Sequence, residues 1–227
     1  MASPETILLR GAGVSRRFGR AGAGVAAVEG ASFEIDADSR IALVGPSGSG
    51  KSTLLHLMAG LLDPSAGSVS WPGLDEAGAG RSGAIAVVFQ APSLVPWLDA
   101  VENVMVPLLL QGLDEKAARQ KAEAALAALG LAEIGDKLPE ELSGGEAQRV
   151  AVARAMAQEA RLILADEPTG QLDQSTAREV MSALLHAADR NHAALVVATH
   201  DPAVATALAV VWRMQHGRLA VTEQAVV

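Results

Sequence analysis

The 227-residue chain contains no cysteine. Disulfides, thiolate metal sites and cysteine nucleophiles are therefore excluded, and the composition is compatible with a reducing compartment. Charged residues are also scarce, at 19% of the chain, whereas hydrophobic residues make up 50%. This balance argues against intrinsic disorder, and a chain of this length can bury a core without disulfide or metal staples.

The sequence has no uninterrupted apolar run of about 18 residues, the length that a membrane-spanning helix needs. One of its more apolar stretches, residues 104–110, contains Pro107. Residues 1–6 lack the basic stretch followed by an apolar run that marks a signal peptide. We therefore expect no transmembrane helix, so that any work at a membrane requires another chain to span it.

Positive charge is in short supply, since the net charge is −8 at pH 7. This argues against broad binding to nucleic acid or to anionic lipid. We therefore predict no nucleic-acid partner, and an anionic ligand would need a local positive pocket.

The chain does contain a complete phosphate-binding motif of the form G-x-x-x-x-G-K-S. Its residues, with the threonine that follows, are Gly45, Pro46, Ser47, Gly48, Ser49, Gly50, Lys51, Ser52 and Thr53. A strand-like apolar run precedes it at 40–44, and a helical pattern ending at Gly60 follows, which is the context that the motif requires. Glycines let backbone N–H groups turn toward an anion, and the helix N-terminus adds partial positive charge. This context disfavours a merely flexible Gly/Ser turn. The motif predicts a nucleoside triphosphatase, with Lys51 on the β- and γ-phosphates and Ser52 on Mg²⁺.

Residues 7–35 alternate short β-like runs with glycines, including a turn at 21–24, which indicates an antiparallel β-subdomain ahead of the phosphate-binding loop. Phe18 falls in a polar loop of this region, at 16–19. It is either a core aromatic at a strand end or a platform on which an adenine ring stacks. The residues alone leave both interpretations open.

An apolar strand over 84–89 follows a Gly/Ala-rich loop at 72–83 and ends at Gln90. The next segment, 91–98, contains two prolines, so we expect it to be irregular. Its apolar side chains are exposed unless another surface covers them. They are Leu94, Val95, Trp97 and Leu98.

Asp99 and Asp114 are predicted to begin two helices, which form a helical insertion before the next motif. In that motif, at 142–149, Ser143 and Glu146 fit a capping box, and a helix start could explain them. It does not explain Gly144 and Gly145, which each cost about 1 kcal/mol in a helix. Two glycines at a helix N-terminus let a phosphate approach the backbone, so the chain carries a second predicted anion site.

Two further apolar runs end in polar residues. Residues 162–165 are typical of a parallel strand buried on both faces, and ligands bind at the carboxyl ends of such strands. There we predict that Asp166 holds Mg²⁺, directly or through water, and that Glu167 is the general base toward the attacking water. The two acids could instead cap the strand end, but adjacent carboxylates repel and a nearby cation would rationalise them. The run at 193–199 ends at His200, which could hydrogen-bond a γ-phosphate or the attacking water.

In this order the motifs resemble those of the nucleotide-binding subunit of ATP-binding cassette (ABC) transporters, from about residue 7 to residue 219. The motifs are 45–53 (Walker A), Gln90 (Q-loop), 142–149 (signature), 162–167 (Walker B with the catalytic Glu), 170–173 (D-loop) and His200 (H-loop). A finer resemblance, to the lipoprotein-release, macrolide-export and cell-division subfamily, rests on residues 88–90, 101–104, 141–145 and 165–170. The chain departs from that subfamily at 38–40, where Asp-Ser-Arg replaces the usual Gly-Glu, and at 72–83, which is shortened.

The resemblance implies one ABC ATPase domain over 1–227 with an α/β, P-loop NTPase fold. Its RecA-like core would be a mainly parallel sheet with helices on both faces, built with the antiparallel β-subdomain from about 7–90 and 160–222. A helical signature subdomain would span about 91–159.

The resemblance also implies a role for each site residue. Lys51, Gln90, Glu167 and His200 would be catalytic. ATP would contact residues 45–53, Phe18 (at the aromatic A-loop position), Gln90, Ser143, Gly144, Gly145 and Asp173. Mg²⁺ would be held by Ser52, Gln90 and Asp166.

Finally, the resemblance implies two partners. A second ATP-binding subunit, in a homodimer, would seal ATP on one Walker A motif with the signature of the other copy. A transmembrane permease would dock near 91–107, which places the chain in the cytoplasm, peripheral at the inner face of the cell membrane. The expected work is export or extrusion of lipoprotein or lipid, and the alternatives are signalling through a membrane partner without transport, or import.

Overall fold

The structure is a computed structural model, and it describes residues 7–19, 24–74 and 83–222. Most of the turn expected at 21–24 and most of the loop expected at 72–83 lie outside these residues. The chain consists of two compact units. The first comprises Met1–Arg81, Leu164–Asp166 and Ala194–Val227, and the second comprises Ser82–Ile163 and Glu167–Ala193.

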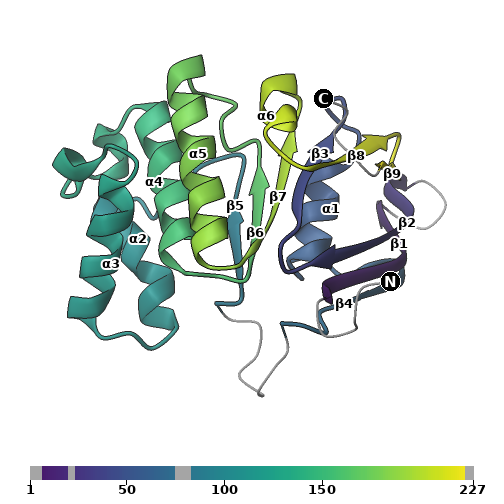
Figure 1. The fold of residues 1–227 in the computed structure, drawn as a ribbon, viewed down its shortest axis with the longest axis horizontal. Coiled ribbons are helices and arrows are strands. Elements are labelled where there is room, and N and C mark those ends of the chain that lie inside the picture. The colour runs from purple at the N-terminus through teal and green to yellow at the C-terminus, as the bar shows by residue number, and fades with distance from the viewer. Residues whose placement is uncertain (1–6, 20–23, 75–82, 223–227) are drawn as a thin grey trace. The chain divides into compact units, whose positions relative to one another are not determined.

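The first unit contains a three-stranded sheet in the order β2-β1-β4 (Figure 1). Strand β1 (Ile7–Phe18) pairs antiparallel with both β2 (Val25–Asp36) and β4 (Ala66–Ser70). In β2, Phe33 and Ile35 are buried whereas Glu34 between them is exposed, because successive side chains point to opposite faces of a sheet. The predicted antiparallel β-subdomain is therefore confirmed.

A larger sheet has the order β5-β6-β7-β3-β8-β9. Strand β3 (Arg40–Val44) pairs parallel with β7 (Ala194–Thr199) and β8 (Val210–Gln215), and β8 pairs antiparallel with β9 (Arg218–Thr222). The remaining strands are β5 (Ile85–Val88) and β6 (Leu162–Asp166). Every residue of β6 and β7 is buried, as expected for strands covered on both faces.

Within the first unit the two sheets pack on each other through aromatic rings. The centroid of Phe33 in β2 lies 5.8 Å from that of Trp212 in β8. The helices of this unit are α1 (Lys51–Met58) and the short α6 (Pro202–Thr206). Helix α1 follows β3 through the predicted phosphate-binding loop, so the strand–loop–helix context of the motif is confirmed.

The second unit is mainly helical, and Figure 1 shows its four α-helices gathered in one bundle. They are α2 (Ala100–Leu110), α3 (Glu115–Ala127), α4 (Gly144–Ala157) and α5 (Gln174–Arg190), with single 3₁₀ turns at Ala132–Ile134 and Pro139–Glu141. Helices α2, α3 and α4 pack against one another, and α4 also packs against α5. Asp99 and Asp114 cap α2 and α3 as predicted, because each carboxylate accepts a backbone N–H of the first turn. Of the helices in the described ranges, none has the length and apolar character needed to cross a bilayer.

Candidate functional site

Three neighbouring strands of the larger sheet, β3, β7 and β6, end at or next to predicted site residues. Val44, the last residue of β3, is paired with Thr199, the last residue of β7. The phosphate-binding loop follows Val44 and His200 follows Thr199, so the two segments leave adjacent strand ends. Strand β6, the other neighbour of β7, ends at Asp166. Ligands of parallel sheets bind at such carboxyl edges.

The glycines of the loop at 45–50 are required by its geometry. A Cβ atom on Gly45 would collide with the carbonyl oxygen of Met214, and one on Gly50 would collide with that of Ala27. Gly48 and Gly50 also have positive φ angles, 74° and 104°, which side chains disfavour. The loop is thus a tightly packed backbone cradle rather than a flexible turn.

Lys51 is the first residue of α1 and is buried. Its Nζ donates to the carbonyl oxygens of Gly45 at 2.8 Å and Pro46 at 3.3 Å, so the ammonium lies over the loop itself. Ser49 Oγ is buried and has no hydrogen-bond partner within the described ranges. A cation above a backbone cradle, with a hydroxyl still able to bond, fits a phosphate group.

Asp166 and Glu167 differ in their surroundings although they are adjacent. Asp166 ends the buried strand and is 4% exposed, whereas Glu167 is half-buried. Glu167 has a φ of 48°, in the left-handed region that non-glycine residues rarely occupy. The backbone therefore turns sharply after Asp166, and strain of this kind is typical of functional sites. The carboxylate of Asp166 together with the hydroxyl of Ser52 suits Mg²⁺. This ion takes few protein ligands and completes its coordination shell with phosphate and water oxygens.

The turn that carries His200 is held by its neighbours. The hydroxyl oxygen of Thr199 accepts from Asp201 N at 3.0 Å, and the carboxylate of Asp201 accepts from Ala203 N at 2.8 Å to cap α6. His200 itself is exposed although the strand before it is buried. His200 thus follows the carboxyl end of β7 as an exposed residue, and its bond to a γ-phosphate or to the attacking water stays a prediction.

The position of Phe18 excludes one of the two sequence interpretations. It is the last residue of β1 rather than part of a loop, and at 43% exposed it is not a core aromatic. The guanidinium carbon of Arg16 lies 4.9 Å from the ring centroid, a cation–π contact. An exposed ring at a strand end can still receive an adenine ring, so the stacking role stays a prediction.

In the second unit, the residues of the predicted signature begin α4. Ser143 caps the helix, since its Oγ accepts from Glu146 N at 3.2 Å, and Glu146 accepts from Ser143 N at 2.8 Å. Bonds from the hydroxyl and then the backbone of Ser143 lower the pKa of Glu146. Added Cβ atoms would lie 3.4 Å from Gln171 at Gly144 and 3.3 Å from Leu172 at Gly145, which is at most tight contact. Packing within the chain therefore does not demand either glycine, whereas a ligand at the helix N-terminus would.

Asp173 has a local structural role. Its carboxylate caps α5 by accepting from the backbone N–H groups and hydroxyls of Ser175 and Thr176. Those bonds, led by the one from the Ser175 hydroxyl, hold the pKa of Asp173 far below its usual range. The nucleotide contact predicted for Asp173 stays a prediction.

Gln90 is exposed and follows β5, and the segment 91–98 contains no regular helix. Of its four large apolar residues only Trp97 is strongly exposed, at 77%. Leu94, Val95 and Leu98 are half-buried, so part of this segment is covered, which is the exception that the prediction allowed.

The reason is Asn103, a fully buried residue of α2 that sequence reasoning did not single out. Its Oδ1 accepts from Val95 N at 2.7 Å, and its Nδ2 donates to the carbonyl oxygens of Val95 at 3.2 Å and Leu98 at 2.8 Å. These bonds turn the loop toward the helix. An amide side chain on the apolar face of a predicted helix was the available signal.

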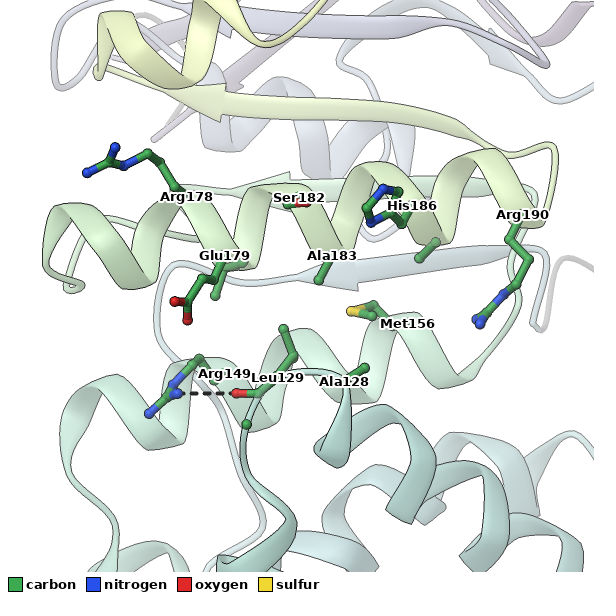
Figure 2. A pocket seen from close by; sticks show the side chains of 13 residues that line it. Ala128, Leu129, Arg149, Met156, Arg178, Glu179, Ser182, Ala183, His186 and Arg190 are labelled. Carbon is green, nitrogen blue, oxygen red and sulfur yellow. Dashed lines mark hydrogen bonds between the residues drawn. The ribbon is translucent and has the colours of Figure 1, made fainter.

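The second unit also has a pocket of about 620 Å³ along α5, shown in Figure 2. Met156 and Leu129 contribute apolar surface, and Arg149 donates to the carbonyl oxygen of Leu129 at 3.2 Å. Figure 2 shows Arg178 and Arg190 at opposite ends of this stretch of α5. None of the predicted ATP-site residues lines this pocket.

A model of the family described as "ABC transporter" matches residues 28–170. The chain belongs to the ABC transporter family. Among its relatives is the lipoprotein-releasing system ATP-binding protein LolD of Chromohalobacter salexigens, 39% identical over 233 residues, which cover 96% of this chain and 98% of that protein. The protein of the same name from Gluconobacter oxydans is 42% identical over 219 residues, which cover 93% and 94%.

Solved structures agree with this assignment. The dimeric post-hydrolysis state of the ATP-binding cassette MJ0796, bound to ADP and Pi, superposes with a TM-score of 0.89 at 30% identity, covering 97% of this chain and 100% of that one. A second dimeric structure of that ABC transporter cassette has the same TM-score at 31% identity. The predicted P-loop NTPase fold is thereby confirmed, and this ABC cassette is an ATPase.

Proposed function

We propose that the chain is the nucleotide-binding subunit of an ABC transporter of the lipoprotein-releasing type, that it forms a homodimer around two ATP molecules, and that it drives a separate permease. The main support for the ATP site is that the phosphate-binding loop, Asp166 and His200 lie at the ends of neighbouring strands of one sheet. The whole chain, 1–227, acts as one ATPase domain, with a helical part over about 91–159.

In the proposed mechanism Lys51 and the backbone N–H groups of residues 45–53 bind the β- and γ-phosphates. Ser52, Asp166 and Gln90 would hold Mg²⁺, which when bound would supply charge neutralisation on these phosphates. Glu167 accepts a proton from the water whose oxygen attacks the γ-phosphorus, and ADP leaves with the electrons of the broken P–O bond. His200 orients the γ-phosphate and that water, and Phe18 stacks on the adenine.

The second anion site is proposed to act on the ATP of the other copy. Ser143, Gly144 and Gly145 would close on phosphates bound to the partner, and Asp173 would lie near the same nucleotide. Two findings support this: the chain does not need the two glycines for its own packing, and the solved relatives are dimers. A monomer should then bind ATP but hydrolyse it poorly.

The permease is proposed to dock near 91–107, where Trp97 presents a large exposed ring. Relatives are named as ATP-binding proteins of lipoprotein-releasing systems, which supports lipoprotein extrusion as the work of the transporter. This subunit is proposed to act on the cytoplasmic side, peripheral at the inner face of the cell membrane.

Co-purification of the permease with a tagged chain, followed by reconstitution in vesicles, tests this function. ATP should drive release of a fluorescently labelled lipoprotein from the vesicles to an added acceptor protein, and Glu167→Gln should abolish the release. ATP hydrolysis without any release would contradict lipoprotein transport and favour signalling through the membrane partner.

A further inference from the structure

Helix α4 holds the chain immediately after Gln90 through Arg154. Its Nη1 donates to the carbonyl oxygen of Ser93 at 3.0 Å, and its Nη2 donates to that of Pro92 at 2.9 Å. Burial lowers the pKa of the Arg154 guanidinium, which nevertheless keeps its charge in proteins. The two carbonyls therefore compensate a desolvated charge, and bonds to charged groups are the strong ones.

The same helix also holds the residue immediately before Gln90. Gln148 is 1% exposed, and its Nε2 donates to the carbonyl oxygen of Phe89 at 3.4 Å, a long hydrogen bond. Side chains of α4 thus bind the backbone on both sides of Gln90, and the firmer of the two attachments is Arg154.

The attached segment is also restrained internally. Ser93 has a φ of 49°, in the left-handed region, and its hydroxyl donates to the carbonyl oxygen of Ala91 at 3.1 Å. A strained backbone of this kind persists only where surrounding bonds determine it. The segment 89–93 is therefore expected to follow α4 when that helix moves.

We propose that Arg154 is a positioning residue that couples Gln90 to the signature residues 143–145 and so makes the two ATP sites of the dimer cooperative. This rests on the proposed function, in which Gln90 acts on the ATP of its own subunit and the signature acts on the ATP of the partner. About nine residues of helix, roughly 13 Å, separate Gly145 from Arg154. A shift of Gln90 on binding one γ-phosphate passes through Arg154 into α4 and changes the position of the signature at the other site.

The test is the dependence of the ATPase rate on ATP concentration for the wild-type chain and three variants. The wild type should have a Hill coefficient approaching 2, the number of sites in the dimer. Arg154→Ala should lower it to about 1, and Arg154→Lys should restore part of it, since an ammonium donates as a point charge without the planar fork. Arg119→Ala is the matched control, because Arg119 is an exposed arginine of the same unit whose ion pair, with Glu123 at 3.8 Å, is on the surface.

A second measurement reports on the attachment itself. Because the chain has no cysteine, Ala91→Cys accepts a single spin label next to Gln90. Arg154→Ala removes two charge-assisted bonds. Each is worth at least a roughly tenfold shift of an equilibrium, so the variant should raise the mobile fraction of the label by at least about tenfold while the thermal melt shows a folded chain. If Arg154→Ala does not fold, Arg154→Lys carries both measurements.

The outcomes distinguish a failure of the coupling role of Arg154 from a failure of the proposed function. An unchanged Hill coefficient in Arg154→Ala, with a cooperative wild type, overturns the coupling role alone, and unchanged label mobility overturns the attachment. A wild type that neither dimerises with ATP nor hydrolyses it cooperatively overturns the proposed function, and with it the coupling.

Discussion

Replacing Asn103 with alanine should destabilise the protein through the loop 91–98. The change leaves Val95 N–H without its acceptor, and an unsatisfied buried donor costs about 1–3 kcal/mol. The carbonyls of Val95 and Leu98 lose one bond each, worth about 1 kcal/mol apiece. The carbonyl of Asp99 loses the Nδ2 bond but keeps the backbone bond from Asn103 N, so it adds little. The sum is about 3–5 kcal/mol.

Thermal unfolding followed by circular dichroism measures this loss. For a chain of this size, 1 kcal/mol corresponds to about 2–4 °C, so Asn103→Ala should lower Tm by roughly 6–20 °C. Asn103→Asp dissects the effect, because it keeps an acceptor for Val95 N–H but turns a carboxylate toward carbonyl oxygens, and it should be no more stable than the alanine variant. Glu123→Ala, at an exposed position of α3, is the control and should stay within about 0.5 kcal/mol of wild type. A Tm change below about 2 °C for Asn103→Ala would refute the reasoning.

Three further substitutions probe the ATP site and its surroundings. Glu167→Gln should retain ATP binding, lower kcat by at least about a hundredfold and yield an ATP-stabilised dimer by light scattering; turnover near wild type would exclude Glu167 as the base. Phe18→Ala should weaken ATP binding by roughly tenfold in calorimetry but leave inorganic triphosphate unaffected, whereas equal weakening of both would point to a structural role. Asp173→Ala should lower Tm at pH 7, because the folded-state pKa of Asp173 is depressed. Its stabilisation is present above the unfolded-state pKa of about 4 and lost as pH falls through the folded value, so a Tm difference that grows in acid would contradict the capping role.

The parts of this structure that were predictable from sequence depend on local rules. The phosphate-binding loop, the caps at Asp99 and Ser143 and the buried strand ending at Asp166 each follow from neighbouring residues, and all are present. The attachments made by Asn103 and Arg154 were not anticipated. Arg154 donates to backbone carbonyls 61 and 62 residues away. Because every residue has a backbone carbonyl, the residue types do not show which carbonyl an arginine will bind.

Other misses concern conformation. The polar residues around Phe18 suggested a loop, yet β1 continues through them because β2 pairs with it as far as Phe18 and Val25. The left-handed backbone at Glu167 was likewise unpredictable, because glutamate has no preference for that conformation.

At Glu167 the left-handed backbone makes thermal stability and catalytic turnover depend on the same residue in opposite ways. Glycine at 167 would relieve a conformational cost of about 1–3 kcal/mol, part of which its greater freedom in the unfolded chain would cancel. The same change would remove the carboxylate proposed as the base. Selection for heat resistance alone would therefore favour glycine at position 167 and so an inactive enzyme. A library of stabilised variants should be screened for ATP hydrolysis before any glycine at this position is accepted.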